Sequence, residues 1–83
     1  MKIGYFADGS WAHKAFEKII KDNTIQIVFI TVRYDKKDKV LLDFAHRYNI
    51  PVELSENINS QAFINTVEKY NADLFVSMSF NQI

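Results

Sequence analysis

The sequence has 83 residues, of which 48 % are hydrophobic and 14 % aromatic, so it predicts one folded domain and excludes a disordered segment. Ten Lys and Arg residues balance ten Asp and Glu residues, which excludes an overall basic field that attracts nucleic acid. The absence of cysteine excludes a disulfide framework, a thiolate nucleophile and sulfur-bound zinc. No stretch resembles a signal peptide or a membrane span, and we expect a cytoplasmic protein without membrane contact.

Short apolar runs alternate with longer segments of helical period, a pattern typical of an α/β fold. Residues 3–6 predict a first strand. The turn Asp8-Gly9-Ser10 ends it, and Ser10 is a candidate N-cap for the helix that follows. The apolar face of this helix consists of Ala12, Ala15, Phe16, Ile19 and Ile20. Residues 25–32 predict a second strand that is buried on both faces.

The rest of the chain continues this alternation. Asp35 or Asp38 caps a second helix, whose inward face consists of Val40, Leu41, Phe44, Ala45 and Tyr48. After Pro51, residues 52–54 predict a brief third strand. Asn59 or Ser60 caps a third helix, whose inward residues are Phe63, Ile64 and Val67, and residues 73–79 predict a fourth strand. We therefore expect residues 1–83 to form one Rossmann-like β-α-β-α-β-α-β domain, with a parallel sheet of order 3-2-1-4 and helices on both faces.

This strand order predicts a ligand crevice where the carboxyl ends of the first and fourth strands diverge. Residues 7–11 form one side of it and residues 79–83 the other. On the first side, Gly9 and Ser10 lead into a helix N-terminus, which suits either an anion or an ordinary cap, and Trp11 either walls a pocket or covers the sheet edge. On the second side, Phe80, Asn81 and Gln82 suit a flat heterocycle, unless Phe80 packs under a further element.

Three other sequence features give weaker indications of a binding site. Gly4 and Gly9 have the spacing of a phosphate-binding loop, but Ser10 stands where its lysine belongs. His13 and His46 have no metal-ligand partners at suitable spacing and are interpreted as surface residues on the polar faces of their helices. A basic cluster, formed by Arg33, Lys36, Lys37 and Lys39, indicates either a phosphate or nucleic-acid contact or a hydrated surface.

Two segments together carry a resemblance to a known family. Residues 1–12, MKIGYFADGSWA, and residues 74–83, LFVSMSFNQI, resemble the amino-terminal half of the folate-dependent formyltransferases, which include the methionyl-tRNA, glycinamide ribonucleotide and sugar N-formyltransferases. The resemblance implies 10-formyltetrahydrofolate as the formyl donor and a primary amine on a nucleotide-linked amino sugar or on methionyl-tRNA as the acceptor. It implies that Phe80, Asn81, Gln82 and Ile83 pass the pteridine largely through their main chain, and that Gly9, Ser10 and Trp11 lie close to the same crevice.

The resemblance carries over no catalytic residue. The family's Asn-x-His motif and its later Asp lie beyond the matched segment, and Asp8, His13 and His46 match none of these positions. We therefore expect the amino-terminal part of such an enzyme, catalytically silent alone and without a metal site. The free edge of its fourth strand is apolar and unguarded, so it favours a further strand or self-association. The alternative is a stand-alone α/β module that binds a nucleotide or a protein without catalysis.

Overall fold

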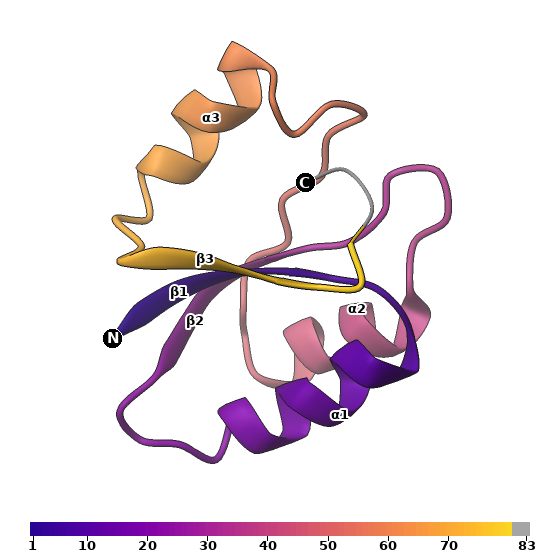
Figure 1. Cartoon of the computed structure of the whole chain (residues 1–83), viewed down its shortest axis with the longest axis vertical. Helices are drawn as coiled ribbons and strands as arrows, with labels where there is room; N and C mark the ends of the chain where they lie inside the picture. The colour runs from indigo at the N-terminus through magenta and orange to yellow at the C-terminus, as the bar shows by residue number, and fades with distance from the viewer. Residues whose placement is uncertain (81–83) are drawn as a thin grey trace.

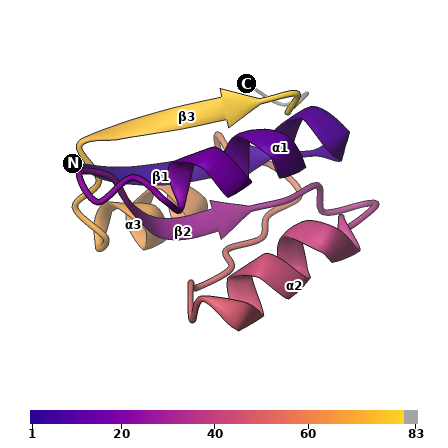
Figure 2. The same cartoon turned by 90° about the horizontal axis from the view of Figure 1, so that it is seen from below.

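A computed structural model describes residues 1–80, which form a parallel sheet between two layers of helices (Figure 1). The elements are β1 (Lys2–Ala7), α1 (Gly9–Ile19), β2 (Gln26–Thr31), α2 (Lys39–Arg47), α3 (Gln61–Glu68) and β3 (Leu74–Met78). The strand order is β2-β1-β3, so β1 lies in the centre. α1 and α2 cover one face and α3 the other (Figures 1 and 2). The predicted α/β class, the parallel sheet and the helices on both faces are confirmed.

The predicted third strand, residues 52–54, does not form. Val52 makes only an isolated bridge to Ile30 on the outer edge of β2, where the Ile30 amide donates to the Pro51 carbonyl at 2.9 Å. Pro51 has no N–H group to extend the ladder. Four residues after Pro51, the Ser55 hydroxyl bonds to the main chain of Asn57 and turns the chain away. The four-strand order 3-2-1-4 is therefore not shown, and the last predicted strand is β3 of this sheet.

Helix starts follow the capping chemistry of small polar residues. Asp38 accepts hydrogen bonds from the Val40 and Leu41 amides at the start of α2, and the Ser60 hydroxyl accepts one from the Phe63 amide at the start of α3. Of the open alternatives, these two residues are the caps. The prediction of Ser10 as the first cap is wrong, because α1 begins at Gly9 and the extended residue before it is Asp8.

The face of the sheet below α1 and α2 is bound to both helices by aromatic side chains. Tyr5 is fully buried, and its hydroxyl donates to the Ala12 carbonyl at 2.8 Å. Burial raises the pKa of Tyr5 to about 12, so this donor stays protonated. Phe16 of α1 stacks on Phe44 of α2 with 4.6 Å between ring centroids. These contacts fix the start of α1 over the carboxyl end of β1.

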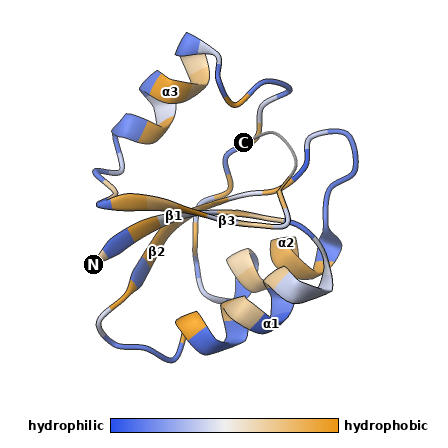
Figure 3. Cartoon of the chain, in the orientation of Figure 1, coloured by the Kyte–Doolittle hydropathy of each residue, from blue (hydrophilic) through white to orange (hydrophobic). Residues whose placement is uncertain are grey.

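The opposite face is an aromatic cluster centred on Phe6. Four rings have centroids between 5.5 and 6.1 Å from that of Phe6, and they belong to Phe29, Phe63, Phe75 and Phe80. Figure 3 shows the corresponding hydrophobic residues along the strands and polar residues in the loop after β2. The cluster joins all three strands to α3.

Several side chains predicted to face inward are exposed. Val40 and Tyr48 of the second helix region are 43 % and 44 % exposed, and Ile64 of α3 is 37 % exposed. Each lies at the margin of an apolar stripe whose centre, such as Leu41 or Val67, is buried.

No helix within residues 1–80 is long and apolar enough to cross a bilayer.

Gly4 is required by close packing against β2. The register of β1 and β2 shifts between Ile3, which pairs with Ile27, and Gly4, which pairs with Phe29. This irregularity brings the Phe29 ring over Gly4, where a Cβ atom would clash with the ring carbons Cζ and Cε1. Only a residue without a side chain fits there.

Gly4→Ala is expected to destabilise the protein by about 1–3 kcal/mol, because the added methyl group overpacks the core. Urea denaturation followed by circular dichroism measures this change. Phe29→Leu removes the clashing ring carbons, so Gly4→Ala should cost less in that background than in the wild type. Equal costs in the two backgrounds would show that the Phe29 ring does not impose the glycine.

Candidate functional site

The turn after β1 and the segment after β3 lie side by side at one edge of the sheet. Parallel strands end at the same edge, and β1 and β3 are neighbours. The Asp8 amide donates to the Met78 carbonyl at 3.1 Å, which fixes the two segments together. The two sides of the predicted crevice are thus adjacent as far as Phe80. Asn81, Gln82 and Ile83 lie outside the described residues.

Both segments use left-handed backbone at this edge. Gly9 has φ +84°, and no atom lies within 4 Å of where its Cβ would be, so the backbone angle and not space requires glycine. Ser79 has φ +58° and is exposed. A side chain in this conformation costs about 1–2 kcal/mol, and such strain gathers at binding sites. Ser79 therefore marks the end of β3 as a candidate binding segment.

The Asp38 carboxylate connects the starts of α1 and α2. One oxygen, Oδ1, caps α2, and the other, Oδ2, accepts from the Gly9 amide at 3.0 Å and pairs with His13 Nε2 at 2.7 Å. The Gly9 N–H group, one of the amides predicted to hold an anion, is thus already bonded to a protein carboxylate. His13, interpreted as a surface residue, has a side chain that is 23 % exposed, but it also pairs with Asp38, which the sequence did not predict.

The charged form of Asp38 is favoured in the fold. Burial acts to raise the pKa of its carboxyl group, but hydrogen bonds from Gly9, His13 and Leu41 outweigh burial and hold the pKa below its ordinary value. No periodic pattern reveals this contact, since Asp38 and His13 are 25 positions apart. The only sequence signal was the helix cap itself.

Phe80 is buried and Trp11 is exposed at the candidate site. Phe80 is 7 % exposed, and its ring packs edge-on against Phe6 at 5.8 Å. Its side chain is therefore not free to stack a heterocycle, and only its main chain is available to a ligand. Trp11 is 71 % exposed and lines a groove beside Met78, at the flank of α1 next to β3. Ser10, also exposed, lies inside the first turn of α1.

Thr31 is a functional candidate that the sequence did not indicate. It ends β2, beside Phe6 of β1, and is completely buried. Its hydroxyl has no hydrogen-bond partner among residues 1–80. Leaving such a group unpaired costs about 1–3 kcal/mol, which makes it a point where a polar ligand group or a further chain segment stabilises the protein.

The basic cluster lies in the loop after β2. Arg33 donates two hydrogen bonds to Asp35, at 3.1 and 2.7 Å, and these bonds lower the pKa of the Asp35 carboxyl group. Lys37 bonds to the Tyr34 carbonyl at 3.3 Å. Two of the four cations thus have partners within their own loop, which weakens the interpretation as a preformed phosphate site.

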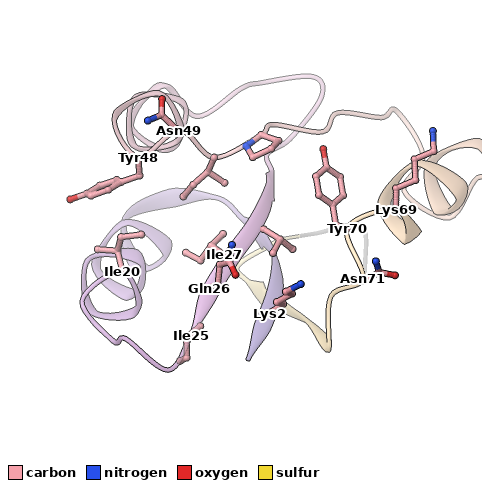
Figure 4. A pocket seen from close by; sticks show the side chains of 13 residues that line it. Lys2, Ile20, Ile25, Gln26, Ile27, Tyr48, Asn49, Lys69, Tyr70 and Asn71 are labelled. Atoms are coloured by element: carbon pink, nitrogen blue, oxygen red, sulfur yellow. The ribbon is translucent and has the colours of Figure 1, made fainter.

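A further cavity of about 680 Å³ lies at the opposite, amino-terminal edge of the sheet (Figure 4). Lys2 and Gln26, at the starts of β1 and β2, line it together with Tyr70. The Tyr70 hydroxyl donates to the Glu53 carboxylate, and this bond raises the pKa of Tyr70 to about 12. The residues that line the cavity include no carboxylate or imidazole group, so it offers no general acid or base of those types.

Residues 1–80 contain no group of three or more His, Cys, Asp and Glu side chains placed to hold a metal ion. The one histidine in the crevice region, His13, is paired with Asp38. What the crevice offers is main-chain polar groups around Gly9 and Ser79. No known protein family matches the chain, and no curated protein matches it.

Asp38→Asn is expected to lower the stability of the protein at pH 7 by about 1–3 kcal/mol, because the charge-assisted bonds to Gly9 and His13 are lost while a capping residue is kept. The lowered pKa means that Asp38 contributes stability above the unfolded value of about 4 and loses it as the pH falls through the folded value. The difference between wild type and variant should therefore shrink at acid pH. Urea denaturation at a series of pH values measures it.

Asp35→Asn is the matched control, because Asp35 is exposed and pairs only with Arg33 in its own loop. Its effect at pH 7 should be clearly smaller than that of Asp38→Asn. Equal effects, or a difference for Asp38→Asn that grows toward acid pH, would contradict the role assigned to Asp38.

Proposed function

We propose that the chain is the amino-terminal part of a formyltransferase and that it contributes residues to the site for 10-formyltetrahydrofolate. One observation carries the proposal: the hydrogen bond from the Asp8 amide to the Met78 carbonyl joins the two segments that resemble this family. The two segments are almost 70 positions apart, yet both border the edge of the sheet where α/β proteins bind their ligands. A resemblance in two separate segments gains weight when they meet at one place.

The topology supports the proposal. The observed three-strand order β2-β1-β3 is compatible with the order 3-2-1-4, and the isolated bridge of Val52 lies at the outer edge of β2, where the outermost strand of that order would pair. The order 3-2-1-4 is typical of the first half of a doubly wound, Rossmann-like sheet. In such a sheet the ligand lies between the strands corresponding to β1 and β3.

The chemistry of the crevice fits a ligand that is recognised through the main chain. Ser79 turns the backbone into the left-handed region directly after β3, and the next residue, Phe80, is itself buried in the core. Main-chain N–H and C=O groups at this point suit the donors and acceptors on the edge of a pteridine. In this proposal Gly9, Ser10 and Trp11 lie near the same ligand, and residues 80–83 line it.

The whole enzyme moves a formyl group from the folate to a primary amine. The amine nitrogen attacks the formyl carbon, and the bond from that carbon to the folate nitrogen breaks as tetrahydrofolate leaves. The acceptor is a nucleotide-linked amino sugar or methionyl-tRNA, and the enzyme is cytoplasmic. The groups that stabilise the tetrahedral intermediate and move the amine proton come from outside these 83 residues.

Calorimetric titration tests the folate site. We expect tetrahydrofolate to bind the chain more tightly than uridine or guanosine monophosphate, since the Gly9 N–H group is already bonded to Asp38. Ser79→Val should weaken folate binding, because a β-branched residue disfavours the left-handed angle, and Ser79→Gly should preserve it. Circular dichroism of each variant establishes that it remains folded.

Tighter binding of a mononucleotide would instead support the alternative, a stand-alone nucleotide-binding module. Equal folate binding by the valine and glycine variants would contradict the role of Ser79. If no folate binds the folded chain, the proposed site is wrong.

The second test is for catalysis. The chain mixed with 10-formyltetrahydrofolate and an amine acceptor is expected to give no formylated product, because no catalytic residue of the family is carried over to it. Mass spectrometry of the acceptor, with a complete formyltransferase as the positive control, measures the transfer. Product formation above the uncatalysed level would show that the chain contains its own catalytic group.

A further inference from the structure

The cavity at the amino-terminal edge of the sheet borders an irregular part of β2. Val52 bridges the outer edge of β2 at Ile30, and no strand in the described part of the chain pairs with that edge nearer the start of β2. The register of β1 and β2 shifts after the Ile3–Ile27 pair, which leaves Val28 as an extra residue of β2 without a partner in β1. Val28 lines the cavity. Such bulges re-aim side chains and are enriched next to active sites.

One part of the cavity lining is apolar. Its aliphatic side chains come from the start of β2 and from the segments after α1 and α2, and they are Ile20, Ile25, Ile27, Val28, Ile50 and Pro51. Tyr48, which is 44 % exposed, adds an aromatic ring to this part (Figure 4). Apolar groups that remain in contact with water gain free energy when another apolar group covers them. An apolar ligand body is therefore favoured here.

The part of the cavity between β1 and α3 is cationic. Lys2 and Lys69 line it and no carboxylate does, so the lining carries a net charge of +2 (Figure 4). Neither lysine belongs to an ion pair found among residues 1–80. Two carboxylates bond to lining residues from outside the cavity: Asp73 accepts from the Lys2 amide, and Glu53 accepts from the Tyr70 hydroxyl. An anionic group is therefore favoured in this part.

The ends of α2 and α3 do not make the cavity a cation site. Asn49 and Asn71, which both line it, have left-handed backbone after these helices, with φ of +56° and +53°. After α2, the Ile50 amide donates to the Ala45 carbonyl at 2.8 Å, so this carbonyl of the last turn already has a partner. Lys69 is the cap residue of α3, and its ammonium group offsets the negative end of that helix.

We propose that this cavity binds a small amphiphilic anion, which is a molecule with an aliphatic or aromatic body and one acidic group. The body covers the apolar part, and the acidic group lies near the lysines. The cavity volume of about 680 Å³ lies within the range of small-molecule sites, about 300–1,000 Å³. The cavity and the crevice at Gly9 and Ser79 lie at opposite edges of the sheet, so the inference does not depend on the proposed folate site.

Two other ligand classes fit less well. A mononucleotide supplies the negative charge, but its ribose brings hydroxyl groups against the apolar part, where they lose hydrogen bonds to water. An uncharged apolar ligand covers the apolar part but leaves both lysines without a counter-charge. The amphiphilic anion is the class that matches both parts of the lining.

The test uses anilinonaphthalene sulfonate, an amphiphilic anion whose fluorescence rises in apolar surroundings, with the full chain. We expect saturable binding that decanoate reverses. Decylamine, which has the same apolar body and the opposite charge, should not reverse it at the same concentration, with both compounds below their micelle concentrations. Amide NMR spectra locate the decanoate: the signals of Gln26, Val28 and Asn49 should shift, and that of Ser79 should not.

Lys2→Glu/Lys69→Glu is expected to weaken decanoate binding by about tenfold, because each substitution replaces an attraction with a repulsion. Both lysines are exposed, so the variant should fold, and circular dichroism checks this. Lys36→Glu/Lys37→Glu makes the same charge change in the loop after β2, away from the cavity. It should leave binding within about twofold of the wild type.

A second pair of variants tests the apolar part. An apolar groove of about 500 Å³ between α3 and β3 includes Ile64, and it is the competing site for an apolar ligand body. Tyr48→Asn should weaken decanoate binding. Ile64→Asn places the same side chain at a residue of similar exposure in the other groove and should not weaken it.

The proposal is overturned if decylamine reverses sulfonate binding as well as decanoate does, if the two charge variants lose binding equally, or if neither loses it. A larger loss in Ile64→Asn than in Tyr48→Asn would assign the ligand to the groove between α3 and β3 instead. Tighter binding of guanosine monophosphate than of decanoate, or no saturable sulfonate binding by the folded chain, also overturns it.

Discussion

The fold depends on the burial of β1. This strand pairs with β2 along one edge and with β3 along the other, and five of its six residues are buried. Buried backbone groups need hydrogen-bond partners, so both neighbours are required, and their parallel direction places three strand ends at one edge. Among residues 1–80, β3 has β1 as its single neighbouring strand. The candidate crevice thus follows from the requirement that β1 be paired on both sides.

Asp38 connects the two helices on one face of the sheet, α1 and α2. Its carboxylate caps α2 and also bonds to the first residue of α1, so two positive helix ends share one negative charge. The opposite face relies on apolar contact, in which Phe6 touches rings from β2, α3 and β3. One side of the sheet is therefore positioned by a partly buried polar network and the other by an aromatic cluster. The crevice lies where the two meet.

The sequence predicted those features that depend on local periodicity or on turn chemistry. The three helices and the three strands of the sheet follow from apolar spacing. Small polar residues reduced the caps of α2 and α3 to two candidates each, of which the structure has Asp38 and Ser60. The prediction of a strand at residues 52–54 was wrong, because Pro51 and Ser55 interrupt the strand pairing that the apolar composition of this segment suggests. The His13–Asp38 contact, the exposure of Ile64 and the unpaired Thr31 hydroxyl depend on how distant segments pack, and no local pattern encodes that.

The contact between the first and last strands also has a consequence for folding. The Lys2 amide donates to the Asp73 carboxylate, and the Asp73 amide to the Lys2 carbonyl, across 71 positions of sequence. Forming β1·β3 therefore requires closure of nearly the whole chain, and contacts of such long range slow folding. During synthesis, β1 can pair with β2 early but must wait for its second neighbour until residue 78 has left the ribosome. Until β3 has emerged, the nascent chain thus carries two open edges, one on β1 and one on β2, and association with chaperones protects such strands.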